Sequence, residues 1–123
     1  MRRPERLAEA LREQVTEIVG FEMDDPRLLA VTVTDVRVSE NMRDAKVFVI
    51  VEGDESQIKA AFRVLQNAAT FVRQQVAMNL SMRFAPLLNF VRDTAEENAS
   101  RVTMILTDLT SKGELIEKED DNG

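Results

Sequence analysis

The strongest constraint on the fold is a helix stop followed by two runs of strand-forming residues. Because proline disfavours helical geometry in the residue before it, a helix that precedes Pro26 must end by Asp25. The runs 31–38 and 45–51 are rich in valine and are separated by a polar turn at 39–44, which is the pattern of a β-hairpin. The sequence therefore predicts a helix that leads into two antiparallel strands.

The first of these runs contains a fault in its alternation. Up to Val33 the valines share one face of the expected strand, but Val36 and Val38 fall on the other face. One extra residue in a strand moves every later side chain to the opposite face, so a β-bulge near Thr34 or Asp35 is suggested. A strand that is covered on different faces along its length would give the same pattern.

An amphipathic helix is predicted before the hairpin. Its apolar residues recur at helical spacing, with glutamates and arginines between them: Leu7, Leu11, Val15 and Ile18. Gly20 weakens the end of this helix before the stop at Asp25-Pro26. Such an apolar stripe is typical of a helix that packs on a core.

A second helical segment follows the hairpin. Asp54 or Ser56 can serve as its N-cap, and apolar residues continue at helical spacing as far as Leu80. Periodicity alone predicts one long helix, which the segment 81–86 ends. A third, short strand is expected over 87–91.

The end of the chain is predicted to hold another helix and a tail. Thr94 and Glu97 have the spacing of a capping box, and Lys112-Gly113 is a suitable helix stop. From Gly113 onward five acidic residues accompany a single lysine. The predicted organisation is one domain over 1–112 and an acidic, disordered tail over 113–123.

The residue types disfavour several functional classes. The chain has no cysteine, which removes disulfides and thiolates and favours a reducing compartment. It has no histidine either, so the most common general base and the usual transition-metal ligands are missing. No apolar run approaches the roughly 20 residues of a spanning helix. We expect a cytoplasmic protein outside the membrane, with no cofactor and no enzymatic activity.

Charge argues both against and for a nucleic-acid partner. The net charge of −6 disfavours binding to a polyanion such as RNA. The segment 59–101, however, holds six basic residues and only three acidic ones. Arginine and lysine on a helix also commonly serve only as solvated side chains. All six aromatic residues are phenylalanines, mostly at core-like positions, which disfavours recognition by base stacking.

Several stretches carry a family resemblance over about residues 2–106. In chain order they are Asp25-Pro26-Arg27-Leu28, Val31-Thr32-Val33-Thr34-Asp35-Val36, Ala45-Lys46-Val47-Phe48-Val49, Val64 to Arg73, the set Arg83, Pro86, Leu88 and Phe90, and finally Asp93 and Arg101. They resemble the bacterial ribosome-binding factor A proteins. The coarse order of elements is similar to the type II KH arrangement of that family.

The resemblance implies an α+β fold and a non-catalytic role. The fold would be KH-like type II (α-β-β-α-α-β), with a three-stranded sheet packed on helices, a C-terminal helix and a short acidic tail. The expected role is binding to free, immature 30S small ribosomal subunits and assistance in late 16S rRNA maturation, particularly in the cold. The implied protein is a monomer without a small-molecule substrate. The residues expected to face RNA are Lys59, Arg63, Asn67, Ala68, Ala69, Thr70, Arg73 and Arg83.

The sequence departs from the family pattern within that set. The family's Ala-x-Gly kink, which takes the place of the KH GxxG loop, has Thr70 at its glycine position. Either the Thr70 hydroxyl bonds to the backbone and keeps the kink, or the helix runs straighter. Three other functions remain as alternatives: a general KH-type module for single-stranded RNA, a protein-binding module without RNA, and a small enzyme.

Overall fold

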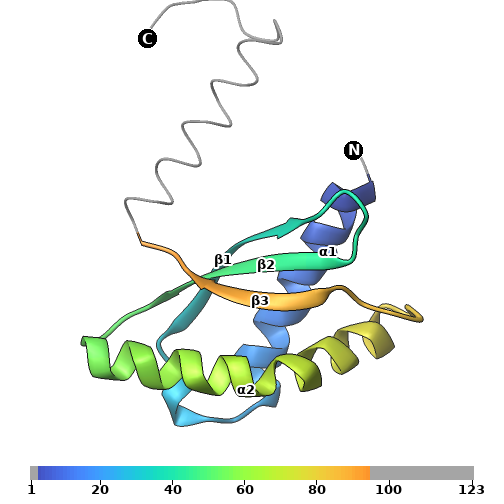
Figure 1. Cartoon of the computed structure of the whole chain (residues 1–123). Helices are drawn as coiled ribbons and strands as arrows, with labels where there is room; N and C mark the ends of the chain where they lie inside the picture. The colour runs from blue at the N-terminus through green and yellow to red at the C-terminus, as the bar shows by residue number, and fades with distance from the viewer. Residues whose placement is uncertain (1–2, 95–123) are drawn as a thin grey trace, which may run out of the picture. The chain divides into compact units, whose positions relative to one another are not determined.

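A helix, a hairpin, a second helix and a third strand follow one another in the computed structural model, which describes residues 3–94 (Figure 1). The elements are α1 (Arg3–Glu17), a π-helical turn η1 (Ile18–Glu22), a 3₁₀ turn η2 (Pro26–Leu28), β1 (Val31–Val38), β2 (Asp44–Val51), α2 (Glu55–Asn79) and β3 (Leu87–Arg92). The predicted last helix, the tail and the boundary at 112/113 lie outside the described residues and stay predictions.

The three strands form one mixed sheet in the order β1-β2-β3. β1 and β2 pair antiparallel, as the hairpin pattern predicts. β3 pairs parallel to β2, because α2 carries the chain back across the sheet before β3 begins (Figure 1). The predicted α+β class with a three-stranded sheet on helices is confirmed.

The predicted bulge is present in β1. Val33 is opposite Val49 and Asp35 is opposite Phe48, so Thr34 is the additional residue. As a result both Val33 and Val36 are buried, although the plain alternation would place them on opposite faces. The bulge, and not a strand covered on both faces, explains the fault in the pattern.

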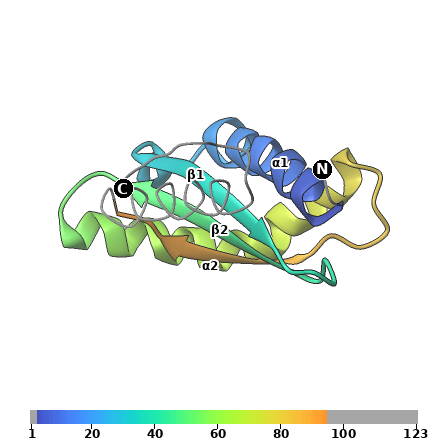
Figure 2. The same ribbon diagram turned by 90° about the horizontal axis from the view of Figure 1, so that it is seen from above.

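One hydrophobic core joins the sheet to both helices. β2 supplies alternate residues to it, among them Val47 and Val49, while Lys46 on the other face is exposed. α1 contributes Leu11, Val15 and then Ile18 in the π turn, and α2 contributes Ile58, Ala61, Leu65, Val72 and Val76. In Figure 2, α1 lies beside β1, and Figure 1 shows α2 alongside β3. Each fully buried aliphatic side chain stabilises the fold by about 1.5–3 kcal/mol.

The first helical segment ends ahead of Asp25, as the stop at Asp25-Pro26 requires. Its last turn widens into the π-helical turn, in which the Met23 N–H donates to the Ile18 carbonyl at 3.0 Å. Asp25 then adopts an extended backbone and its carboxylate accepts a hydrogen bond from the Arg27 N–H at 2.9 Å. The stop at Asp25-Pro26 is confirmed, and the exposed Gly20 lies within the widened turn.

The second helix begins at a capping box. Asp54, and not Ser56, is the N-cap: its carboxylate accepts from the Gln57 N–H, and the Gln57 side chain accepts from the Asp54 N–H, both at 2.8 Å. Each bond satisfies a backbone donor that the helix start leaves unpaired.

Residues 55–79 form a single α-helix, which corrects the two helices of the α-α arrangement expected from the resemblance. Thr70 lacks the backbone freedom of glycine, and its hydroxyl forms no hydrogen bond with the backbone in the part of the chain that the structure describes. Thr16, in contrast, donates to the Arg12 carbonyl at 2.6 Å. The α-helix is continuous through Thr70. Its axis bends about halfway along α2 (Figure 1).

The end of α2 is a Schellman motif built on a serine. The Met82 N–H donates to the Ala77 carbonyl at 2.8 Å and the Ser81 N–H donates to the Met78 carbonyl at 3.2 Å. Ser81 has φ = +53°, in the left-handed region that favours glycine. This closing turn fixes the direction in which the chain leaves the helix.

Ser81→Gly is expected to raise the free energy of unfolding by about 0.5–1 kcal/mol, because glycine adopts a positive φ without the steric cost of a Cβ. Urea unfolding followed by circular dichroism measures it. Ser56→Gly is the matched control, since Ser56 lies in the first turn of α2. There the same substitution should lower the free energy by about 0.5 kcal/mol. Destabilisation by Ser81→Gly would contradict the expectation.

Candidate nucleic-acid interface

The segment from Ser56 to Arg92 contains no aspartate or glutamate. It carries five basic residues, in a chain with 22 acidic residues and a net charge of −6. The rest of the chain therefore has a net charge of −11. The segment comprises almost all of α2, the α2–β3 loop and β3. A polyanion would meet its lowest electrostatic cost on this part of the molecule.

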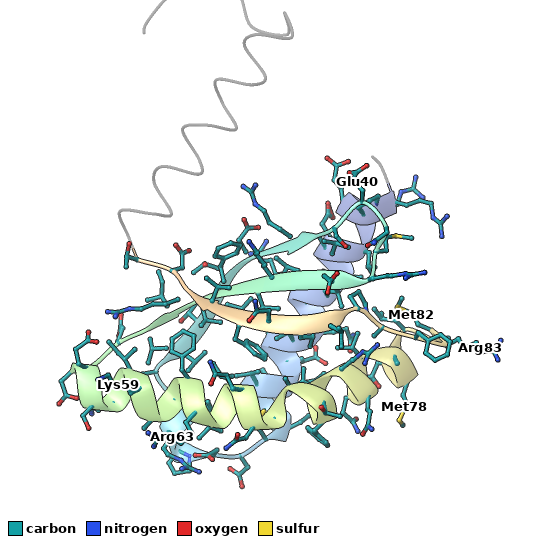
Figure 3. The ribbon with its side chains drawn as sticks, viewed as in Figure 1. Glu40, Lys59, Arg63, Met78, Met82 and Arg83 are labelled. Atoms are coloured by element: carbon teal, nitrogen blue, oxygen red, sulfur yellow. The ribbon has the colours of Figure 1, made fainter. Side chains whose placement is uncertain are left out.

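Four of the predicted site residues form one exposed stripe along α2: Lys59, Arg63, Asn67 and Thr70. Their spacing of three or four residues places them on one face of the helix, with steps of about 4.5–6 Å along the axis. Neither Lys59 nor Arg63 forms an ion pair among residues 3–94. In Figure 3 both side chains extend from the N-terminal half of α2. The helix-surface stripe, as we call these four residues, presents two charges and two polar groups to solvent.

Ala68 and Ala69 belong to a different part of the helix surface. Both are half-buried and pack against the hydrophobic core. Neither contributes a polar side chain. Because their side chains are only methyl groups, little covers the helix backbone beside Asn67, and another molecule could approach it closely.

Arg73 is also turned away from the stripe. Its side chain is half-buried, and its Nε donates to the Ala85 carbonyl at 2.8 Å. The bond joins the helix to the loop that follows it. The structure thus gives Arg73 a positioning role that the sequence did not indicate.

Arg83 lies beyond the C-terminal end of α2, far from Lys59 (Figure 3). Its guanidinium carbon stands 5.7 Å from the centre of the Phe84 ring, within the range of a cation–π contact. Both residues are exposed. The predicted site residues are therefore not gathered in one pocket but spread along α2 and the loop after it.

A shallow depression of about 280 Å³ adds Arg27 to this surface. It is lined by Arg27, Arg63, Val64, Asn67 and Ala68. Arg27 forms a two-point ion pair with Asp25, with Nε–Oδ1 at 3.0 Å and Nη2–Oδ2 at 2.7 Å. Hydrogen bonds from Arg27 lower the pKa of Asp25, and the same carboxylate raises the pKa of Arg27. The sequence placed Arg27 only in the helix-stop motif, since nothing in its spacing indicates a position beside α2.

Arg92 is exposed, but unlike Lys59 and Arg63 it forms an ion pair within the protein. Its Nη1 and Nη2 donate to the two carboxylate oxygens of Glu55 at 3.3 and 3.1 Å. The pair ties the end of β3 to the start of α2. Its charge is therefore already balanced within the protein.

The aromatic residues correct one inference from the sequence. Phe21, Phe71 and Phe84 are exposed, so half of the phenylalanines are not at core positions. The pattern misled because Phe84 lies in a loop and Phe21 lies in the π-helical turn, so the spacing of a regular α-helix applies to neither residue. Within residues 3–94 there is no cluster of three potential metal ligands and no helix suited to crossing a membrane.

A family model and curated relatives all match this chain to one protein family. The family model described as Ribosome-binding factor A matches residues 3–106 of the chain. The Ribosome-binding factor A of Solibacter usitatus is 42% identical over 105 residues, which is 85% of either protein. That of Rhodopirellula baltica is 42% identical over 113 residues, covering 92% of this chain and 82% of the relative.

Solved structures agree with the sequence comparison. The crystal structure of ribosome-binding factor A from Thermus thermophilus superposes with a TM-score of 0.64 at 28% identity, covering 72% of this chain and 94% of that one. A homology model of the Thermus thermophilus protein, fitted into the cryo-EM map of its complex with 30S, gives a TM-score of 0.55 at 31% identity, covering 72% of this chain and 89% of that one.

Proposed function

The chain belongs to the ribosome-binding factor A family, and from this premise we propose that it binds the free 30S ribosomal subunit and assists late maturation of its 16S rRNA. In this proposal it acts as a cytoplasmic monomer that catalyses no reaction and matters most in the cold. The fitting of a relative into the map of a 30S complex supports the choice of partner.

The observation that carries the proposal is the acid-free segment 56–92 with its exposed cations. The helix-surface stripe would face phosphates, with Lys59 and Arg63 as charge partners and Asn67 and Thr70 as hydrogen-bonding groups. Arg83 would contact the RNA separately, at the far end of α2. For Arg73 we propose mainly support of the loop, since its Nε is already bonded to the Ala85 carbonyl.

The small number of phosphate contacts favours a protein that binds one structured RNA particle over one that binds any RNA. Each contact releases counterions, so the logarithm of the affinity falls with the logarithm of salt concentration by about 0.7–0.9 per contact. Three cations, Lys59, Arg63 and Arg83, predict a slope of about −2 to −3. With so few contacts and a net charge of −6, affinity must come from fitting a structured particle. This favours a ribosomal subunit over short free oligonucleotides.

Cosedimentation with purified 30S subunits, large subunits and intact ribosomes across a salt series tests the proposal. We expect the full chain to pellet with free 30S subunits, with a shallow salt dependence, and to remain in the supernatant with the other two particles. Binding to no particle at low salt would refute it. Equal binding to every particle, or stronger binding to short oligonucleotides, would favour a general RNA-binding module.

A further inference from the structure

Two residues of the α2–β3 loop project from an otherwise fixed backbone. On one side the Schellman motif holds Met82 through its N–H bond to the Ala77 carbonyl. On the other side Arg73 holds the Ala85 carbonyl, and Pro86 is buried. Only Arg83 and Phe84 lie between these anchors. Their side chains are therefore presented at little further cost in backbone entropy.

Phe84 is an exposed aromatic residue that does not belong to the hydrophobic core. The ring is 74% exposed, although it sits next to the buried Ala85 and Pro86. Arg83 stands 5.7 Å from its centre and has no ion-pair partner among the described residues. An exposed ring with an arginine beside it is an arrangement that proteins use to stack unpaired bases.

The surroundings favour a nucleic acid over a protein as the occupant. Arginine and aromatic side chains are common at both kinds of interface. Here, however, the loop belongs to the acid-free segment and follows directly from the helix that carries Lys59 and Arg63. A polyanion can contact the stripe and the loop together along α2.

We propose that Arg83 and Phe84 form a stacking site for one unpaired nucleobase of the bound RNA. The base lies on the open face of the Phe84 ring, and the guanidinium of Arg83 contacts the adjoining phosphate. This inference rests on the proposed function, because it names a contact within that complex. In this arrangement α2 contacts phosphates only, whereas the loop contacts one base and the phosphate next to it.

The composition of the chain provides a direct reporter. Because it contains no tryptophan or tyrosine, Phe84→Trp introduces the only indole, at the proposed site. Stacking of a base should quench its fluorescence. Phe21→Trp is the matched control, since Phe21 is 80% exposed in the π-helical turn, outside the acid-free segment. We expect 30S subunits, and at low salt an oligouridylate of about ten nucleotides, to quench the indole of Phe84→Trp but not that of Phe21→Trp.

A binding measurement separates stacking from simple hydrophobic contact. Phe84→Leu should weaken 30S binding about tenfold without changing the salt slope, whereas Phe84→Tyr should bind within about twofold of wild type, because a lost stack costs about 1–3 kcal/mol per base. Both side chains remain apolar enough to leave the loop intact. Circular dichroism of each variant checks the fold.

Each result decides between the two proposals. If 30S subunits bind while the indole of Phe84→Trp is not quenched and Phe84→Leu binds like wild type, the stacking site is refuted and the proposed function stands. If 30S subunits do not bind but oligouridylate quenches the Phe84→Trp indole, the proposed function is refuted and the stacking site stands. Quenching of that indole by RNA-free subunit proteins alone, or equal quenching in Phe21→Trp, refutes the stacking site.

Discussion

Lys59→Glu combined with Arg63→Glu is expected to weaken binding to 30S subunits by roughly 100-fold at ~0.1 M salt. Each substitution removes one phosphate contact and puts a repelling charge in its place. The slope of affinity against salt should become shallower by about 2, since two contacts are lost. Both residues are exposed, so circular dichroism and the unfolding midpoint should stay at wild-type values. Cosedimentation over a salt series measures the effect.

Arg6→Glu combined with Arg12→Glu is the matched control for that variant. Both arginines are exposed on α1, and the pair changes the net charge by the same amount. If the surface on α2 is the contact, the α1 variant should lose less than about fivefold. Equal weakening by both variants would mean that only total charge matters, and the helix-surface stripe would lose its assigned role.

Thr34→Val is expected to lower the free energy of unfolding by about 2–3 kcal/mol. The Thr34 hydroxyl lies 2.6 Å from Oδ2 of Asp93 and 3.2 Å from the Phe48 carbonyl. A hydroxyl has one hydrogen, so the shorter bond to the carboxylate receives it. Asp93 is only 2% exposed, and removing a donor from a buried carboxylate costs about 1.5–3 kcal/mol. For a domain of this size the melting temperature should fall by roughly 10 °C.

Thr32→Val is the control for this effect. Thr32 lies on the same strand, is exposed and forms no side-chain hydrogen bond within residues 3–94. The same change of hydroxyl to methyl there should alter the free energy of unfolding by less than about 0.5 kcal/mol. Thermal and urea unfolding of both variants test the comparison. A Thr34→Val protein as stable as wild type would show that the bond from β1 to Asp93 does not hold the sheet together.

Local patterns predicted the parts of the fold that are determined locally. The mismatch between Val33 and Val36 located the bulge, since a strand repeats every two residues and one extra residue restores the phase. The capping position at Asp54 was among the two candidates, and the choice depended on the Gln57 side chain returning the bond. The resemblance added the element order but left open whether the helix would break near Thr70, and in the structure α2 is continuous there.

The long-range contacts could not be predicted in this way. The bond between Thr34 and Asp93 joins residues 59 positions apart, and that between Arg73 and Ala85 crosses a loop. Periodicity describes which face of an element is apolar, but it does not say which polar group will meet which carbonyl. For the same reason the sequence pattern grouped Arg73 with Arg63 as RNA-facing residues. In the structure Arg73 donates a hydrogen bond to the Ala85 carbonyl of the loop, whereas Arg63 is exposed to solvent.

The separation of charge along the chain has a consequence for how this protein would meet its partner. Residues 3–55 carry 13 acidic and seven basic residues, whereas residues 56–92 carry five basic residues and no acidic one, so the acidic charge is concentrated outside most of α2 and β3. In the field of a polyanion an uneven distribution of charge favours some orientations of approach over others. Under the proposed function, collisions that lead with the stripe on α2 would be attracted at short range, and those that lead with an acidic part of the chain would be repelled. The acidity of the chain would thus select the orientation of encounter and limit non-specific binding along RNA.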